Sequence, residues 1–168
     1  MKRSAGFTLI ELIIVIVILG ILAVTAAPKF MNMQGDARKS VLNGMSASIK
    51  TAANLVYSKA IIAGVEKQAG PVNLAIQGVP GNFTEIAFGY PTATDAGILE
   101  VLDAKISETG ANAEWGRSVG ANGSYYMMWP TGVATTEATA IKAACYIQYT
   151  PATSATVPPV YTVKATGC

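Results

Sequence analysis

Glu11 lies inside a run of apolar residues that extends from Phe7 to Ala27. No other charged residue follows Arg3 until Lys29. The run is about 21 residues long, or roughly 31 Å as a helix, which matches a hydrocarbon core of about 30 Å. A charged side chain inside a membrane span costs roughly 2.5–3.5 kcal/mol on insertion scales. We therefore expect Glu11 to have a functional partner.

The basic residues Lys2 and Arg3 precede this apolar run. Positive residues next to a membrane span stay on the cytoplasmic side. The run is longer than the apolar part of an ordinary secretory signal, which has about 7–15 residues. We expect it to be retained as an anchor that spans the membrane once.

The Gly6–Phe7 junction, the following Thr8-Leu9-Ile10-Glu11-Leu12 and the long apolar run resemble the class III signal of type IV prepilins. Residues 19–30 and 36–40 are similar to the mannose-sensitive haemagglutinin (MSHA) branch of these pilins. The resemblance implies that a prepilin peptidase cuts between Gly6 and Phe7. It also implies that the new amino group of Phe7 is methylated.

This implied cleavage gives Glu11 a partner. A free α-amino group has a reference pKa of about 7.7–8.0, so that of Phe7 is mostly cationic at neutral pH. Glu11 follows four residues later on the same helix face. Pairing removes much of the cost of placing the two charges in lipid. The pair forms within one subunit or between neighbouring subunits. The family resemblance implies the second arrangement, in which the pair sets the register of a subunit as it joins the filament.

A second helical pattern follows the apolar run. Apolar residues recur at steps of three and four up to about Ile62, with polar residues between them. The pattern predicts an amphipathic continuation of the first helix that ends at Gly64. Pro28 lacks a backbone donor, which predicts a kink there, and Gly20 is a second weak point.

Short apolar runs separated by glycine and proline follow, and they predict strands. The predicted strands are Val72–Gln77, Phe83–Tyr90, Ser124–Trp129, Cys145–Tyr149 and Val160–Lys164. Thr94 and Asp95 are expected to cap a short helix.

These elements predict an α+β fold in which a long N-terminal helix, its apolar half protruding, packs against a small antiparallel sheet. The family resemblance implies the type IV pilin fold. We expect four parts: a leader at 1–6, a membrane and filament-core helix at 7–27, an amphipathic helix half at 28–64, and a β-rich head with a C-terminal disulfide region at 65–168.

The composition argues against catalysis. The chain has no histidine, which removes the usual general base and most zinc sites. The carboxylates of Asp95, Glu100, Asp103 and Glu108 do not have the spacing of a calcium loop and are expected on a solvated helix face. We expect no enzymatic activity, no cofactor and no metal site.

The formal charge of +2 comes from Lys2 and Arg3. Without them, ten basic residues (12 − 2) stand against ten acidic ones. This balance argues against nucleic acid as a partner.

The two cysteines, Cys145 and Cys168, both follow the apolar run. Two thiols beyond a membrane span predict one disulfide in an oxidising compartment, such as a bacterial periplasm or the cell exterior.

An aromatic group accompanies Arg117, and its members are Trp115, Tyr125, Tyr126 and Trp129. Aromatic rings with arginine are typical of carbohydrate and single-strand surfaces. They also form the cores of small sheets, which is the interpretation we favour.

By resemblance, the chain is expected to be the major structural subunit of a pilus that mediates adhesion to surfaces and biofilm attachment. The implied partners are many copies of itself, the prepilin peptidase, an inner-membrane assembly platform with assembly and retraction ATPases, and an outer-membrane secretin. The precursor is expected in the inner membrane with its head in the periplasm, and the assembled subunit on the cell surface.

Two alternatives stay open. Pseudopilins of type II secretion share the same start, but the major ones generally lack a C-terminal disulfide and carry a calcium loop. A DNA-uptake or minor pilin is the second alternative, and a basic stripe on the head would favour DNA uptake.

Overall fold

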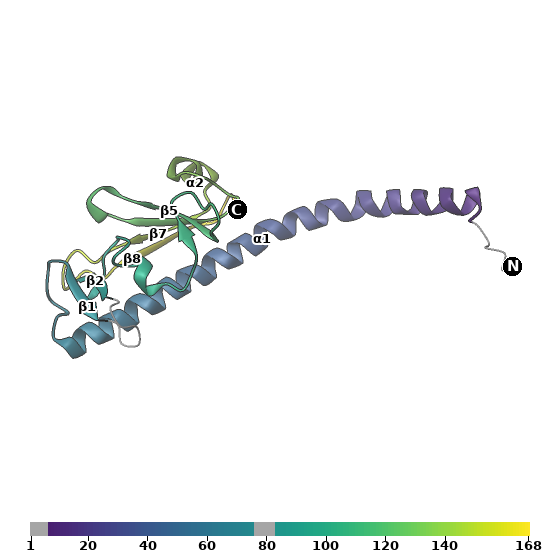
Figure 1. The fold of residues 1–168 in the computed structure, drawn as a ribbon. Helices are drawn as coiled ribbons and strands as arrows, with labels where there is room; N and C mark the ends of the chain where they lie inside the picture. Colours follow the sequence, from purple (N-terminus) through teal and green to yellow (C-terminus); the bar gives the residue numbers. More distant parts are fainter. Residues whose placement is uncertain (1–6, 76–82) are drawn as a thin grey trace. The chain divides into compact units, whose positions relative to one another are not determined.

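The computed structural model describes residues 7–75 and 83–168 (Figure 1). These residues form two compact units that divide between Ala37 and Arg38. The four-part division expected from the sequence stays a prediction. The sequence Gly78-Val79-Pro80-Gly81 also predicts a turn, and these residues lie outside the described ones.

Helix α1 extends over Leu9–Ala63 and runs without interruption through Gly20 and Pro28. The kinks expected at these two positions stay predictions. The helix ends where Gly64 adopts a φ of 69°, a left-handed conformation that glycine accommodates best. The predicted end of the helix is therefore confirmed.

Three antiparallel strands form a sheet in the order β1-β2-β3. Its strands are β1 (Val72–Ala75), β2 (Phe83–Ala87) and β3 (Tyr90–Pro91). Between β2 and β3, Phe88 and Gly89 have φ values of 51° and 80°. Two consecutive left-handed residues make the tight turn that suits a hairpin, so the single strand predicted over 83–90 is divided in two.

A second sheet has five strands in the order β4-β5-β6-β7-β8. They are β4 (Ile106–Ser107), β5 (Trp115–Val119), β6 (Tyr126–Pro130), β7 (Tyr146–Thr150) and β8 (Val160–Lys164). The pairs from β5 to β8 are antiparallel, whereas the two-residue β4 joins β5 in parallel. The predicted α+β class with an antiparallel sheet is confirmed, and the parallel β4 is an addition to it.

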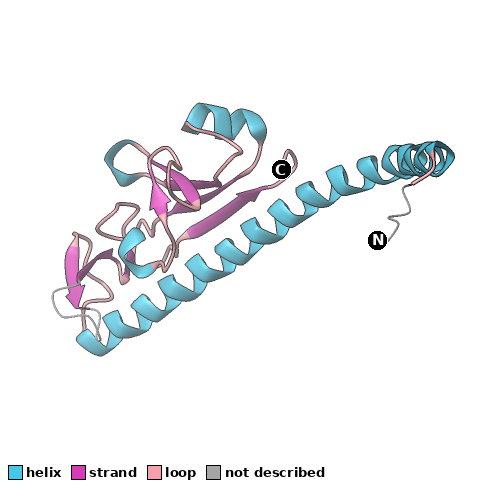
Figure 2. Cartoon of the chain, turned by 45° about the vertical axis from the view of Figure 1, so that its right-hand side comes forward, coloured by secondary structure: helices cyan, strands magenta, loops and turns pink. Residues whose placement is uncertain are grey.

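Within residues 38–168, the five-stranded sheet lies between α1 and the short helix α2 (Glu137–Ala143) (Figures 1 and 2). All five residues of β6 are buried, because both faces of this strand are covered. Tyr126 and Met128 belong to the core on the α1 side, whereas Met127 and Trp129 belong to the core on the α2 side. The strand is thus the centre of a three-layer arrangement.

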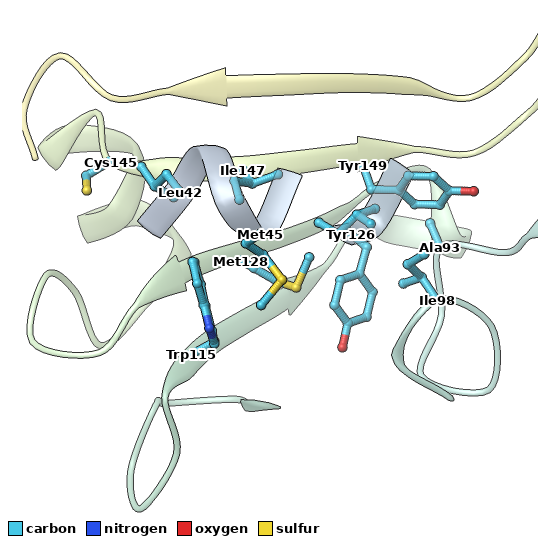
Figure 3. Packing of buried hydrophobic residues seen from close by; sticks show 11 residues of the cluster. Leu42, Met45, Ala93, Ile98, Trp115, Tyr126, Met128, Cys145, Ile147 and Tyr149 are labelled. Carbon is cyan, nitrogen blue, oxygen red and sulfur yellow. The ribbon is translucent and has the colours of Figure 1, made fainter. Parts of the chain in front are cut away.

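The larger core joins α1 to the sheet (Figure 3). Leu42, Met45 and Ile49 of α1 are buried and pack with Ile147 and Tyr149 of β7. Met45 and Ile49 belong to the predicted apolar stripe, but that stripe included Val41, which is 52% exposed, and the structure buries Leu42 instead. The spacing of three and four residues explains why this half of α1 packs on the sheet.

Other elements also differ from the sequence expectations. Strand β5 and helix α2 were not predicted. The helix expected after Thr94 is a short 3₁₀ helix, η1 (Leu99–Val101). The Thr94 hydroxyl accepts a hydrogen bond from the Gly97 N–H (3.1 Å), which forms a tight turn before the helical residues.

Candidate functional site

Thr8 and Glu11 are joined by three hydrogen bonds at the start of α1. Oε2 of Glu11 accepts from the Thr8 N–H (2.8 Å) and from the Thr8 hydroxyl (2.9 Å), and Thr8 Oγ1 accepts from the Glu11 N–H (3.4 Å). This reciprocal arrangement is a capping box, which satisfies donors that a helix start leaves unpaired. The T-x-x-E spacing typical of a capping box is present in the sequence, but the box was not predicted from it.

The other carboxylate oxygen of Glu11, Oε1, has no hydrogen-bond partner among the described residues. Phe7, directly before the cap, is 93% exposed. Gly6 lies outside the described residues, so the geometry of the Gly6–Phe7 junction is not part of this site. The site therefore consists of one carboxylate with one oxygen held by its own helix and the other open to a donor from outside.

The segment that follows is a fully exposed apolar helix. Leu9–Ala26 has a mean hydropathy of 3.0 and is long and apolar enough to cross a membrane. None of it is buried within the chain. Each large aliphatic side chain gains about 1.5–3 kcal/mol when it leaves water, so the segment requires lipid or other protein around it.

Thr25, the polar residue near the far end of this segment, is satisfied within the helix. Its hydroxyl donates to the carbonyl oxygens of Ile21 (3.2 Å) and Leu22 (3.0 Å). Such internal bonding is required of a hydroxyl in an apolar environment.

Cys145 and Cys168 form a disulfide with Cα atoms 4.9 Å apart. Cys145 is fully buried beside β7, and the N–H of Gly167 donates to the carbonyl of Ala144 (3.3 Å). From α1, Nη1 of Arg38 donates to the carbonyl oxygen of Cys168 (3.4 Å). The expected disulfide therefore ties the last residues to β7 and to the helix.

The aromatic group belongs to the core of the head. Trp115, Tyr126 and Trp129 are at most 5% exposed, and the indole N–H of Trp129 donates to the Ala134 carbonyl (2.9 Å). Tyr125 is half-buried, and its hydroxyl bonds to Glu137 of α2, which raises the pKa of Tyr125. These positions confirm the core interpretation of the aromatic group.

Arg117 is used within the head. Its Nη2 lies 2.6 Å from Asp95 Oδ2 and 3.6 Å from Glu108 Oε1. The Tyr126 hydroxyl donates to the other oxygen of Asp95 (3.0 Å), and burial raises the pKa of Tyr126. Two of the four carboxylates considered in the sequence thus serve an ion-pair network. Among the described residues, no group of three or more His, Cys, Asp or Glu residues is placed to hold a metal ion.

A family model described as the prokaryotic N-terminal methylation motif matches residues 1–27. No solved structure matches the chain.

Among curated proteins, the chain is 44% identical over 50 residues to the type IV narrow pilus major component PilA5 of Thermus thermophilus, covering 30% of this chain and 43% of that protein. It is 40% identical over 57 residues to the type IV major pilin protein PilA of Myxococcus xanthus (34% and 26% covered). It is 39% identical over 54 residues to the type II secretion system core protein G of Pseudomonas aeruginosa (32% and 38% covered).

The chain thus spans less than half the length of each of these relatives. The motif and the relatives support a type IV pilin or a pseudopilin subunit, and they do not separate the two.

Proposed function

We propose that this chain is the major structural subunit of a type IV pilus that mediates adhesion to surfaces and biofilm attachment, as in the MSHA type. The observation that carries the proposal is the methylation motif at residues 1–27 joined to an apolar helix with no buried part. Such a helix requires lipid before assembly and other helices after it, which is the life cycle of a pilin.

The proposed processing site is the bond between Gly6 and Phe7. A prepilin peptidase cuts there and methylates the Phe7 amine, while the precursor is held in the inner membrane with its head in the periplasm. Oε1 of Glu11, which has no partner among the described residues, then accepts the Phe7 ammonium of a neighbouring copy. This contact sets the register as a subunit enters the filament.

The proposed filament is a helical homopolymer whose core contains the helices of residues 7–27, with the heads as an outer shell. Close packing is assisted by small residues, and the Cα of Gly20 has open space where a side chain would project. An inner-membrane platform, assembly and retraction ATPases and an outer-membrane secretin are the proposed assembly partners, and the fibre ends up outside the cell.

The second candidate is a type II secretion pseudopilin, which the similarity to core protein G favours. The Cys145–Cys168 disulfide favours the pilus instead, since major pseudopilins generally lack a C-terminal one. A DNA-uptake or minor pilin is less well supported, because Arg117 is engaged by Asp95 and Glu108.

Electron microscopy of cells with and without this chain tests the proposal. We expect surface filaments and surface attachment to disappear on deletion and to return with the wild-type chain. In sheared filaments, this chain is expected to be the main protein. Unchanged filaments together with a loss of protein secretion would instead identify a pseudopilin.

A further inference from the structure

Among the described residues, three hollows lie along one side of the second half of α1. In order along the helix, their volumes are about 220, 180 and 490 Å³. The α1 residues that line them include Val41, Gly44, Ser48, Ala52, Leu55 and Ile62, together with the basic Lys59. These positions recur at steps of three or four, so they lie on one side of the helix, which we call the grooved side.

The grooved side is apolar and open. Val41, Leu55 and Ile62 are 52%, 61% and 86% exposed. Leu102 and Val101 form parts of the opposite walls of the first and second hollows. A row of exposed aliphatic side chains beside unfilled hollows is typical of an interaction surface.

Three carboxylates stand at the walls of these hollows. Asp103 and Glu114 line the first hollow, and Glu100 lines the second. All three are exposed, and none forms an ion pair with a described residue. They contrast with Asp95 and Glu108, which Arg117 engages. Lys59 lines the second hollow together with Glu100, and it also lines the third hollow. The negative charge that the described residues leave uncompensated is therefore at the first hollow, beside Asp103 and Glu114.

Lys50 lies on the opposite side of the same helix. It follows Ser48 by two residues, which is a rotation of about 200° at roughly 100° per residue. Its side chain is exposed and has no ion pair among the described residues. It lies between Ser48 and Ala52 along the helix, level with the junction of the first and second hollows.

We propose that the grooved side of one copy receives the Lys50 side of α1 from a second copy. The inference rests on the proposed function, because copies in a helical polymer share one orientation. One side of each copy then meets a different side of the next, which is a heterologous contact. The carboxylates of the first hollow on one copy and Lys50 on the next are complementary in charge. Because the two surfaces differ, a pair of copies still has one free grooved side and one free Lys50 side. Further copies can therefore add at both ends, and the contact repeats along a filament.

The apolar hollows and the charges have different roles in this contact. Exposed ion pairs add little to stability, so the aliphatic side chains supply most of the affinity. Charge complementarity mainly selects the partner and its register, and like charges placed together are strongly unfavourable. Reversing one charge is therefore expected to have a larger effect than removing it.

Carbodiimide coupling of wild-type filaments tests the contact directly, because it joins a lysine to a carboxylate without a spacer. We expect dimer bands in which Lys50 is linked to Glu100, Asp103 or Glu114, identified by mass spectrometry. Within one chain these groups lie on different sides of α1, so such a link reports a contact between copies. A link between Lys59 and Glu100 can form within one chain, because both line the second hollow. Links from these carboxylates to Lys59, Lys142 or Lys164, without any to Lys50, would overturn the proposal.

Charge exchange gives an independent test. Lys50→Glu and Asp103→Lys, each alone, are expected to reduce the mass of sheared filaments on the order of tenfold. The double variant is expected to recover most of the loss, and Lys164→Glu is the matched control with little effect. Equal amounts of processed, disulfide-bonded subunit show that the variants fold. A double variant no better than either single one would contradict the contact, whereas wild-type cells without filaments would contradict the proposed function itself.

Discussion

Tyr57 on α1 stacks on Tyr90 in β3, with ring centroids 4.5 Å apart and planes inclined by 12°. The Tyr57 ring fits here because residue 89 is glycine, where an added Cβ would lie 2.7 Å from Tyr57 Cδ2. The stack attaches the last turns of the helix to the three-stranded sheet.

A double-mutant cycle measures this attachment. Tyr57→Leu and Tyr90→Leu are each expected to lower the free energy of unfolding, with a coupling energy of about 0.5–1.5 kcal/mol between them. The measurement is denaturant unfolding of the full chain in detergent. Losses that simply add would show that the stacked geometry contributes nothing beyond burial.

The head should lose stability in alkaline solution. Burial, with a contribution from Tyr90, raises the pKa of Tyr161 from 10.0 to about 12. Burial also raises the pKa of Tyr149, whose hydroxyl donates to the Pro91 carbonyl (2.6 Å).

A raised pKa means that the folded state holds the proton more tightly than the unfolded state. The stabilisation is therefore complete below pH 10 and declines as the pH rises through about 12. We expect Tyr161→Phe to move alkaline unfolding to higher pH, followed by circular dichroism and phenolate absorbance. An unchanged transition would contradict this assignment.

Loss of the disulfide should weaken the head. Cys145 and Cys168 are 23 positions apart, and closing a loop of that length stabilises a domain by about 3 kcal/mol on the chain-entropy model. Cys168→Ser is expected to lower the melting temperature, the steady-state amount of the chain and the number of filaments. Identical melting of the wild-type chain with and without reductant would argue against this contribution.

Processing should depend on residue 6. Gly6→Val places a branched side chain at the proposed cleavage site, so the leader should remain attached. N-terminal mass measurement is expected to find a methylated Phe7 in the wild-type chain and Met1 in the variant. A wild-type chain that begins at Ala27 or Pro28 would indicate an ordinary signal peptide.

Glu11→Val separates membrane insertion from assembly. The substitution removes a charge from the span, so insertion should be at least as efficient as before, and cleavage after Gly6 should continue. The Phe7 ammonium of a neighbour then loses its acceptor, at a cost of several kcal/mol per subunit. We expect a processed membrane pool with few filaments by microscopy. Normal piliation would exclude the pairing of Glu11 with Phe7.

Periodicity made α1 predictable, because its buried residues repeat over many turns. Strand β8 was predicted with its observed bounds, because its β-branched and aromatic residues lie between the Pro158-Pro159 pair and Gly167. Strand β5 was missed because Gly116 is uncommon inside strands and Arg117 and Ser118 interrupt its apolar run. Arg117 is held there by Asp95, a contact between distant residues that no local pattern reveals.

Helix α2 was missed for a different reason. It has seven residues, too few for a helical period, and its capping box uses Thr139 in place of the usual glutamate. At the candidate site, Glu11 was recognised because its neighbours are apolar. Its hydrogen bonds to Thr8 could have been predicted only from the three-residue spacing between Thr8 and Glu11. The grooved side was not foreseen, because its carboxylates come from segments far from α1 in sequence.

The disulfide also restricts strand exchange between copies. Strand β8 lies at the edge of its sheet and pairs with β7, and the Cys145–Cys168 bond joins the two strands at the open end of their hairpin. The hairpin is therefore a covalent ring, closed by the loop at one end and by sulfur at the other. Strand β8 cannot leave for a neighbouring copy unless β7, in the interior of the sheet, leaves with it. In the proposed filament, where many identical edge strands would lie close together, the disulfide would thereby protect against domain swapping.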